Sequence, residues 1–280
     1  MSQTSALTGQ GRAETDKAQI VAISGGKGGT GKTFFAVNLA VELRARGYKV
    51  LVFDADINLS NVSILLHIDE SRPFMDFVHR EAPIDALIQK GVGGVDAIYV
   101  SDSLDHVLDL TDEQYETLLQ GLAGVESEYD YIIVDTSAGL DDLNTKLMVL
   151  ADRIVLVANP EATSVVDVYR VIKIMASRVP GIRFDLVINK AVTAESAAAL
   201  FANLCGTASQ NKIQTHLEFL GYIPEDGKRV LESIQKRTPI LVLHQTGRLN
   251  ECFGLIVDTL LRGQQRRRRF RFFYNLFGRG

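Results

Sequence analysis

The chain has 280 residues, of which 46% are hydrophobic and 23% charged, a composition typical of a folded globular protein and not of a disordered one. Its formal net charge of −4 is unevenly distributed, because the last seventeen residues hold six of the 30 lysines and arginines and none of the 34 acids. The rest of the chain therefore carries −10. An acidic body argues against a general nucleic-acid-binding protein, and the basic end indicates a local anionic target.

Cysteine and histidine spacing gives little support to a disulfide or a metal site. Cys205 and Cys252 are isolated in the sequence, and the five histidines show no ligand spacing, which suits a reducing cytoplasm. No apolar run reaches the roughly 18 residues of a membrane-spanning helix, and the polar residues 1–17 do not resemble a signal peptide. We therefore expect a flexible arm over 1–17 and a cytoplasmic protein.

Apolar runs and helical patterns alternate from residue 18 onward. The run at 18–24 ends at a glycine cluster, as a buried parallel strand does, and the helix that follows has Phe35, Leu39 and Leu43 on one face and ends near Gly47. Further strands are predicted at 49–56, 131–135, 153–159, 183–189 and 217–223, and the less regular stretch 60–130 suggests one more. This alternation predicts one α/β domain over 18–263, with helices on both faces of a mainly parallel sheet.

The segment GKGGTGKT, residues 26–33, has the P-loop spacing of glycine, four residues and Gly-Lys-Thr, and lies between a predicted strand and a predicted helix. Such a turn points backbone N–H groups at phosphate oxygens, and the helix N-terminus adds positive potential. Lys32 would bridge the β and γ phosphates of a nucleoside triphosphate, and the Thr33 hydroxyl would bind Mg²⁺. The loop residues predicted to hold the phosphates are Gly26, Gly28, Gly29, Thr30 and Gly31.

Lys27 is surplus to that scheme, because a second cation near Lys32 adds repulsion unless negative charge builds up there during a reaction. The segment KGGTGKT resembles the deviant Walker A motif of the MinD/ParA family of P-loop ATPases, and the resemblance runs from about residue 19 to about residue 260. It implies that Lys27 is catalytic and reaches across a dimer interface to the nucleotide of the other subunit. ATP would then close a homodimer, and hydrolysis would open it.

The stretch FDADINLSN, residues 53–61, resembles the first switch region of that family. It stands at the end of a predicted strand, where open α/β sheets bind their ligands. The resemblance implies that Asp54 is an acid on the metal side and that Asp56 positions the attacking water, with Asn61 as a weaker candidate. A simpler alternative is that one of the two acids caps a turn.

The stretch IIVDTSAGL, residues 132–140, resembles the second switch region. The resemblance implies that Asp135 is the acid of a Walker B motif and that Gly139 can move its N–H toward the γ phosphate. Ser137 stands where the family often has proline or alanine.

Later loops resemble the adenine-binding part of the family. Asn189 ends a predicted strand, and its amide suits the donor and acceptor edge of a purine. GYIPED, residues 221–226, resembles the loop that closes over the base, with Pro224 and Glu225 as implied contacts. A strand end followed by a turn is an equally good interpretation of Pro224 and Glu225 taken alone.

Residues 264–280 form a basic and aromatic tail. As a helix, the tail would present one apolar face to a membrane and arginines to the headgroups, and it would fold only on that surface. The apolar residues are Phe270, Phe273, Tyr274, Leu276 and Phe277, and the basic ones include Arg267, Arg268 and Arg271. One copy would bind anionic lipids weakly, whereas the two tails of an ATP-bound dimer would bind strongly. A solvated basic tail and a nucleic-acid-binding tail are the alternatives.

Within the family, the stretches at 155–175 and 186–204 are most similar to the FlhG (FleN) branch, whose members limit flagellar number and set flagellar placement. The resemblance implies a partner-stimulated ATPase at the inner face of the cell membrane. Its partners would be an FlhF-like GTPase, a flagellar switch protein or a transcriptional regulator, with nucleic acid disfavoured. A MinD-type division-site ATPase and a ParA-like DNA-associated segregation ATPase stay open as alternatives, as does a binding module without functional hydrolysis.

Overall fold

The computed structural model describes residues 18–56, 61–68, 77, 82–99 and 111–262. The predicted arm over 1–17 and the predicted tail over 264–280 lie outside the described residues, as does most of the first switch stretch beyond Asp56. In the described part of the chain, no helix is both long enough and apolar enough to cross a lipid bilayer.

An eight-stranded sheet forms the centre of the molecule, in the order β3-β4-β2-β5-β1-β6-β7-β8. Every neighbouring pair is parallel except β3 with β4. The strands are β1 Gln19–Ser24, β2 Val50–Asp54, β3 Gln89–Lys90, β4 Asp96–Ile98, β5 Tyr131–Asp135, β6 Arg153–Ala158, β7 Ile182–Ala191 and β8 Thr215–Pro224. The central strands are buried on both faces, which explains why they read as continuous apolar runs in the sequence.

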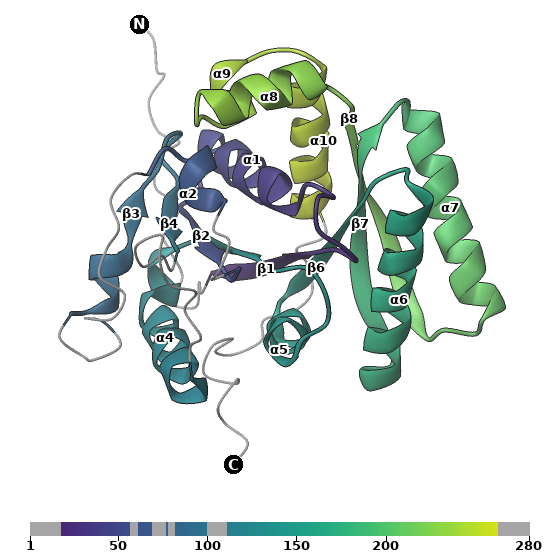
Figure 1. The fold of residues 1–280 in the computed structure, drawn as a ribbon, viewed down its shortest axis with the longest axis horizontal. Helices are drawn as coiled ribbons and strands as arrows, with labels where there is room; N and C mark the ends of the chain where they lie inside the picture. The colour runs from purple at the N-terminus through teal and green to yellow at the C-terminus, as the bar shows by residue number, and fades with distance from the viewer. Residues whose placement is uncertain (1–17, 57–60, 69–76, 78–81, 100–110, 263–280) are drawn as a thin grey trace, which may run out of the picture.

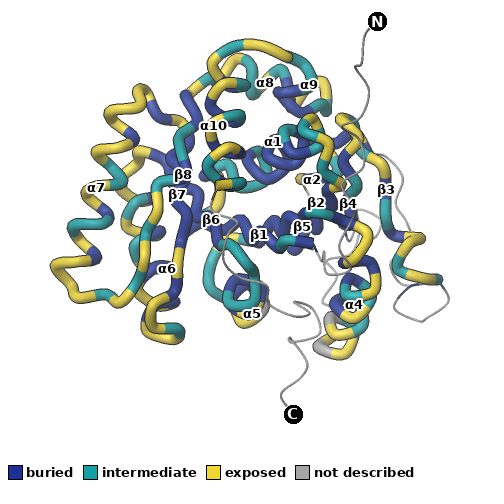
Figure 2. Tube along the Cα trace, turned by 180° about the vertical axis from the view of Figure 1, so that it is seen from behind, coloured by how far each residue is buried: buried dark blue, intermediate teal, exposed yellow. Residues whose placement is uncertain are grey.

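Helices cover both faces of this sheet (Figure 1). The α-helices are α1 Lys32–Ala45, α2 Val62–Leu65, α4 Asp112–Val125, α5 Asp142–Leu150, α6 Ala162–Arg178, α7 Ala194–Gln210, α8 Gly227–Gln235, α9 Ile240–Leu243 and α10 Arg248–Arg262, with short 3₁₀ helices at Ile84–Leu87 and Glu126–Glu128. Alternate residues of β1 face opposite cores: Val21 and Ile23 pack with α1, α9 and α10, whereas Ile20 and Ala22 pack on the side of α4 to α7. Figure 2 shows the buried strands between exposed outer helix faces.

The predicted fold class is confirmed: one mainly parallel sheet with helices on both faces. The predicted helix after the glycine cluster ends at Ala45, and Gly47 takes a left-handed φ of 92° just beyond it. Within the described residues of the stretch 60–130 there are two short strands, β3 and β4, where the sequence indicated one. These strands have two and three residues, too few for an alternating pattern to be visible in the sequence.

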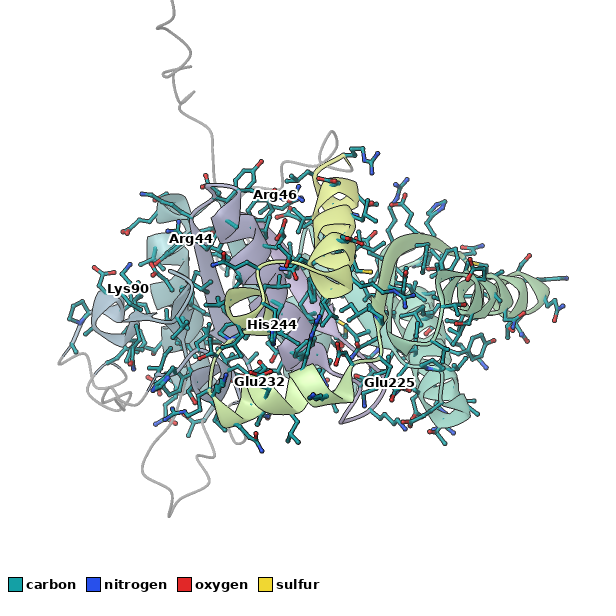
Figure 3. The ribbon with its side chains drawn as sticks, turned by 90° about the horizontal axis from the view of Figure 1, so that it is seen from above. Arg44, Arg46, Lys90, Glu225, Glu232 and His244 are labelled. Carbon is teal, nitrogen blue, oxygen red and sulfur yellow. The ribbon has the colours of Figure 1, made fainter. Side chains whose placement is uncertain are left out.

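Helix α1 is fastened to α10 along its length. Phe35 stacks on Phe253 with ring centroids 5.9 Å apart, and Phe34 meets the same ring edge-on at 6.3 Å. At the far end of α1, Arg46 forms an ion pair with Asp258 and donates to the Gly254 carbonyl at 2.8 Å. Figure 3 shows Arg46 beside α10. The helix that begins in the glycine-rich loop is therefore joined to the last described helix of the chain.

Candidate nucleotide and magnesium site

The predicted site residues gather at the carboxyl edge of the sheet, where an open parallel sheet binds ligands. The glycine-rich loop leaves β1 after Ser24 and leads directly into α1. β5 lies next to β1, and β2 lies on the other side of β5. The last residues of these two strands, Asp54 of β2 and Asp135 of β5, are register partners. The sheet therefore places the two acids side by side next to the start of α1.

Asn189, near the end of β7, forms a hydrogen bond with the backbone of the glycine-rich loop. Its amide nitrogen donates to the Thr30 carbonyl at 2.8 Å, and its side-chain oxygen accepts from the Lys190 N–H at 2.9 Å. Gly31 has a φ of 93°, and a Cβ there would lie 2.2 Å from the Asn189 amide nitrogen. Glycine at this position is thus required both by backbone conformation and by close packing.

Three groups couple electrostatically at the start of α1. Asp135 is buried and accepts a hydrogen bond from the Thr33 hydroxyl. Burial raises the pKa of Asp135 from its ordinary 3.8 to about 6, against the Thr33 hydrogen bond and the positive charge of Lys32, which lower it. The negative charge of Asp56 adds to the increase. Such convergence of a lysine and buried acids is typical of a functional site.

The two residues predicted to bind Mg²⁺, Thr33 and Asp54, fit a hard cation, and the neighbouring Asp135 adds a third oxygen donor. Asp135 Oδ1 is buried and has no hydrogen-bond partner among the described residues, and the Asp54 carboxylate is 1% exposed. With the Thr33 hydroxyl, these groups form the all-oxygen set that Mg²⁺ prefers in phosphate sites. Thr33, Asp54 and Asp135 are therefore the residues that would hold the ion, directly or through water.

Asp56 lies beyond β2 and is half-buried. Its backbone N–H donates to Asp54 Oδ1 at 3.0 Å. Asp54 therefore accepts a hydrogen bond from the turn that follows β2, as the turn-capping alternative expected for one of the two acids. Burial raises the pKa of Asp56, Lys32 opposes the increase, and the charge of Asp141 adds to it. Asn61 lies at the N-cap of α2, after the undescribed stretch 57–60.

Lys27 extends toward the start of α6. Its ammonium group lies 2.6 Å from Glu161 Oε2 and 2.8 Å from Thr163 Oγ1, and the side chain is 31% exposed. The ion pair lowers the pKa of Glu161. In the single chain, the predicted cross-subunit lysine is thus held by its own subunit, and its contact with a second nucleotide stays a prediction.

The predicted base contacts lie at the ends of β7 and β8. The Glu225 N–H donates to the Ala191 carbonyl at 3.2 Å, which brings the two loops together, and Pro224 is buried. Figure 3 shows Glu225 where the chain enters α8. Asn189 uses its amide to support the phosphate loop, so its contact with adenine, like those of Pro224 and Glu225, stays a prediction.

Three residues of this region carry contacts that the sequence did not indicate. Glu161 at the N-cap of α6 and Thr163 in its first turn bind Lys27. Polar residues after a buried strand are a general sign of a site, but they did not identify this contact. Lys190 has a φ of 56° and reaches the Gly29 carbonyl at 3.4 Å. Isolated surface lysines are common, so the sequence held no signal for this contact.

Comparison with known proteins agrees with this geometry. A family model described as an AAA domain matches residues 18–181. The antiactivator FleN of Pseudomonas aeruginosa is 31% identical over 222 residues, covering 79% of each chain. The flagellum site-determining protein YlxH of Helicobacter pylori is 29% identical and covers 88% of this chain and 84% of its own. The septum site-determining protein MinD of Neisseria meningitidis is 28% identical, with coverage of 93% and 99%.

Solved structures share the fold. The cell division ATPase MinD of Pyrococcus furiosus superposes with a TM-score of 0.70 at 24% identity, covering 88% of this chain and 99% of its own. MinD of Pyrococcus horikoshii, solved with Mg-ADP, has a TM-score of 0.69 at 23% identity, with coverage of 88% and 98%. The chain thus has a P-loop, has paired acids at the edge of the sheet, and matches these relatives. It therefore belongs to the MinD/ParA family of P-loop ATPases and is similar to the FleN branch of that family.

Proposed function

We propose that this protein is an ATP-hydrolysing switch that dimerises with ATP, binds the inner face of the cell membrane through its tail, and regulates flagellar number or placement. The observation that carries the proposal is the arrangement around the start of α1. There the P-loop, Lys32 and the buried Asp135 converge at the carboxyl edge of the sheet. Bound Mg²⁺ would neutralise charge on the phosphates, and Asp56 would orient water toward them.

Dimerisation is supported by the position of Lys27. Its ammonium group is hydrogen-bonded to the exposed residues Glu161 and Thr163. Both partners lie at the protein surface, where water screens ion pairs, so releasing Lys27 would cost little. An ATP-bound second subunit could therefore take Lys27 over, as the family resemblance implies.

The contacts between α1 and α10 support communication between nucleotide and tail. Arg46, the C-cap of α1, binds α10 at Gly254 and Asp258, and Arg153 of β6 donates to the Leu260 carbonyl at 3.2 Å. Helix α10, which precedes the tail, is thus bonded to the end of the helix that follows the P-loop. Each tail arginine near anionic lipid contributes about 1 kcal/mol, so one tail binds weakly. A dimer carries two tails, and the second binds as a tethered event.

The flagellar role rests on the relatives FleN and YlxH, with an FlhF-like GTPase, a flagellar switch protein or a transcriptional regulator as the proposed partner. A division-site role is the second candidate, because the match with MinD of Neisseria meningitidis covers 93% of this chain and 99% of that MinD. Deletion of the gene in its host separates the two. Altered flagellar number with normal septa supports the flagellar role, and misplaced septa support the division role.

Co-sedimentation with anionic liposomes tests the membrane switch. The full chain is compared in Mg-ATP and Mg-ADP with a chain ending at Gly263 and with a full-length Phe270→Ser, Phe273→Ser, Phe277→Ser variant that keeps the arginines. We expect the full chain to sediment in ATP and both variants to stay in solution. Binding without ATP, or binding by either variant, contradicts the coupling. Tail-dependent binding to DNA but not to liposomes would favour the ParA-like alternative.

A further inference from the structure

A hydrogen-bonded clamp joins the second switch region to the helix that follows it. The Asn144 amide nitrogen donates to the Ser137 hydroxyl at 2.6 Å and to Asp141 Oδ2 at 2.6 Å. The Asn144 backbone N–H donates to Asp141 Oδ1 at 2.7 Å. Asn144 is 1% exposed, although it stands in the first turn of α5. We refer to Ser137, Asp141 and Asn144 as the switch clamp.

The clamp does more than cap the helix. Asp141 is the N-cap of α5, and its bond to the Asn144 N–H is the ordinary capping contact. That contact needs only the backbone N–H of residue 144, so any residue except proline would preserve it. The buried amide adds two side-chain bonds, and the one to Ser137 reaches seven residues back into the switch loop. Burying an amide is unfavourable unless it is paired, so Ser137 and Asp141 fix its orientation.

The opposite end of the loop is fixed to the sheet. Both the N–H and the hydroxyl of Thr136 donate to the Ile23 carbonyl of β1, at 3.1 and 2.9 Å. Between the two fixed ends lies Gly139, which has a φ of 109°. Among the described residues, apart from its chain neighbours, no atom lies within 4 Å of the position a Cβ would take there. The loop is therefore held at Thr136 and at the switch clamp.

The clamp lies at one end of a loop that begins at the candidate site. Thr136 follows directly after Asp135, the buried acid that ends β5. The loop therefore runs from this acid to the clamp, and a displacement of the clamp would move Gly139 relative to Asp135.

We propose that Asn144 is a positioning residue for ATP hydrolysis, which acts by clamping Ser137 and Asp141 so that the loop from Thr136 to Leu140 keeps its geometry at the phosphate end of the site. The inference rests on the proposed ATPase function. The clamp also explains why serine stands at position 137, where the family often has proline or alanine: the hydroxyl accepts from Asn144.

The test compares Asn144→Leu with Thr145→Val under steady-state ATP hydrolysis in Mg²⁺ with anionic liposomes. Thr145 is the neighbouring residue of α5, is 8% exposed, and accepts a hydrogen bond from Arg178 at 3.1 Å, so its variant loses a buried polar contact away from the loop. We expect Asn144→Leu to lower kcat about tenfold, because misplaced groups slow an oriented reaction. KM and the affinity for a fluorescent ATP analogue should stay within about twofold of the wild type. Thr145→Val should keep the wild-type kcat.

A second variant keeps the test informative if Asn144→Leu does not fold. Ser137→Ala removes the hydroxyl that accepts from Asn144 and donates to Asp141 Oδ2, and it leaves the helix cap intact. Ser137 is a half-buried loop residue, and we expect kcat to fall about threefold at unchanged KM. Equal kcat values for the clamp variants and Thr145→Val, with an active wild type, overturn this inference alone. A wild type that does not hydrolyse ATP overturns the proposed function and this inference with it.

Discussion

The two ends of helix α1 differ in how their polar groups are satisfied. At its start, Thr30 Oγ1 and Asp135 Oδ1 are buried without a hydrogen-bond partner in the described part of the chain. At its end, Arg46 uses three nitrogens on Glu42, Gly254 and Asp258. Unpaired buried polar atoms cost free energy unless a ligand pairs them, whereas paired ones hold the fold. We conclude that one helix has a ligand-binding end and a structural end.

One atom departs from this contrast. Arg44 Nε, near the end of α1, is also buried without a partner among the described residues, although Nη1 of the same side chain donates to the Tyr48 carbonyl at 2.9 Å. Arg44 is thus partly satisfied and lies far from the glycine-rich loop. The predictions below test whether the two ends respond separately.

The largest expected effect is at the start of α1. Lys32→Met should abolish measurable ATP hydrolysis and weaken ATP binding by about 100-fold or more, because the cation that faces the phosphates is lost. Isothermal titration calorimetry measures the affinity. Lys173→Met, on the exposed side of α6, is the control and should bind ATP normally. Tight ATP binding by Lys32→Met would contradict the site.

A second effect should depend on pH. Burial raises the pKa of Asp135 to about 6, so the folded state binds this proton more tightly than the unfolded chain. The resulting stability is full below about pH 4 and is lost as the pH rises through about 6. In EDTA without nucleotide, Asp135→Asn should therefore lose less stability than the wild type between pH 4 and 6. Thermal melting at several pH values measures this, and parallel curves for the two proteins would contradict it.

The same substitution separates folding from binding. At pH 7, Mg-ATP should raise the Tm of the wild type but not that of Asp135→Asn, because the ligand binds the native state and needs the carboxylate. An equal increase in both proteins would show that Asp135 does not contribute to holding Mg-ATP.

At the structural end, Arg46→Ala should lower the free energy of unfolding by about 1–2 kcal/mol through lost hydrogen bonds and packing. Its affinity for ATP should stay unchanged. Arg262→Ala is the control, since Arg262 makes an exposed bond to the Asp258 carbonyl of its own helix, and its effect should stay within about 0.5 kcal/mol. Urea denaturation measures both. A large loss of ATP affinity in Arg46→Ala would break the separation of the two ends.

The smallest effect is expected at Glu161. Glu161→Gln removes the charge that pairs with Lys27, but the pair lies at the surface, so the Tm should not change measurably. Differential scanning calorimetry in 50 mM and 500 mM salt checks this. A Tm of the wild type that falls steeply with salt, and that becomes salt-independent in Glu161→Gln, would show that the pair stabilises the fold after all.

The fold and the centre of the site follow from local patterns. The strands around β1 are predictable because burial on both faces leaves continuous apolar runs. Lys32 is predictable from the spacing of the P-loop, and Asp135 is predictable because it directly follows an apolar run typical of a buried strand. The clamp of Asn144 on Ser137 was not predictable, because a polar residue in the first turn of a helix is common. The partners of Lys27 were not predictable either, because they come from a segment 134 and 136 residues further along the chain.

Sedimentation velocity of the full chain tests the central claim most directly. It compares the protein in Mg²⁺ with a non-hydrolysable ATP analogue and with ADP, beside the Lys32→Met variant. The account predicts a dimer with the ATP analogue, a monomer with ADP, and a monomer for Lys32→Met in both. The same sedimentation coefficient for the wild type in both nucleotides would contradict a switch at the start of α1.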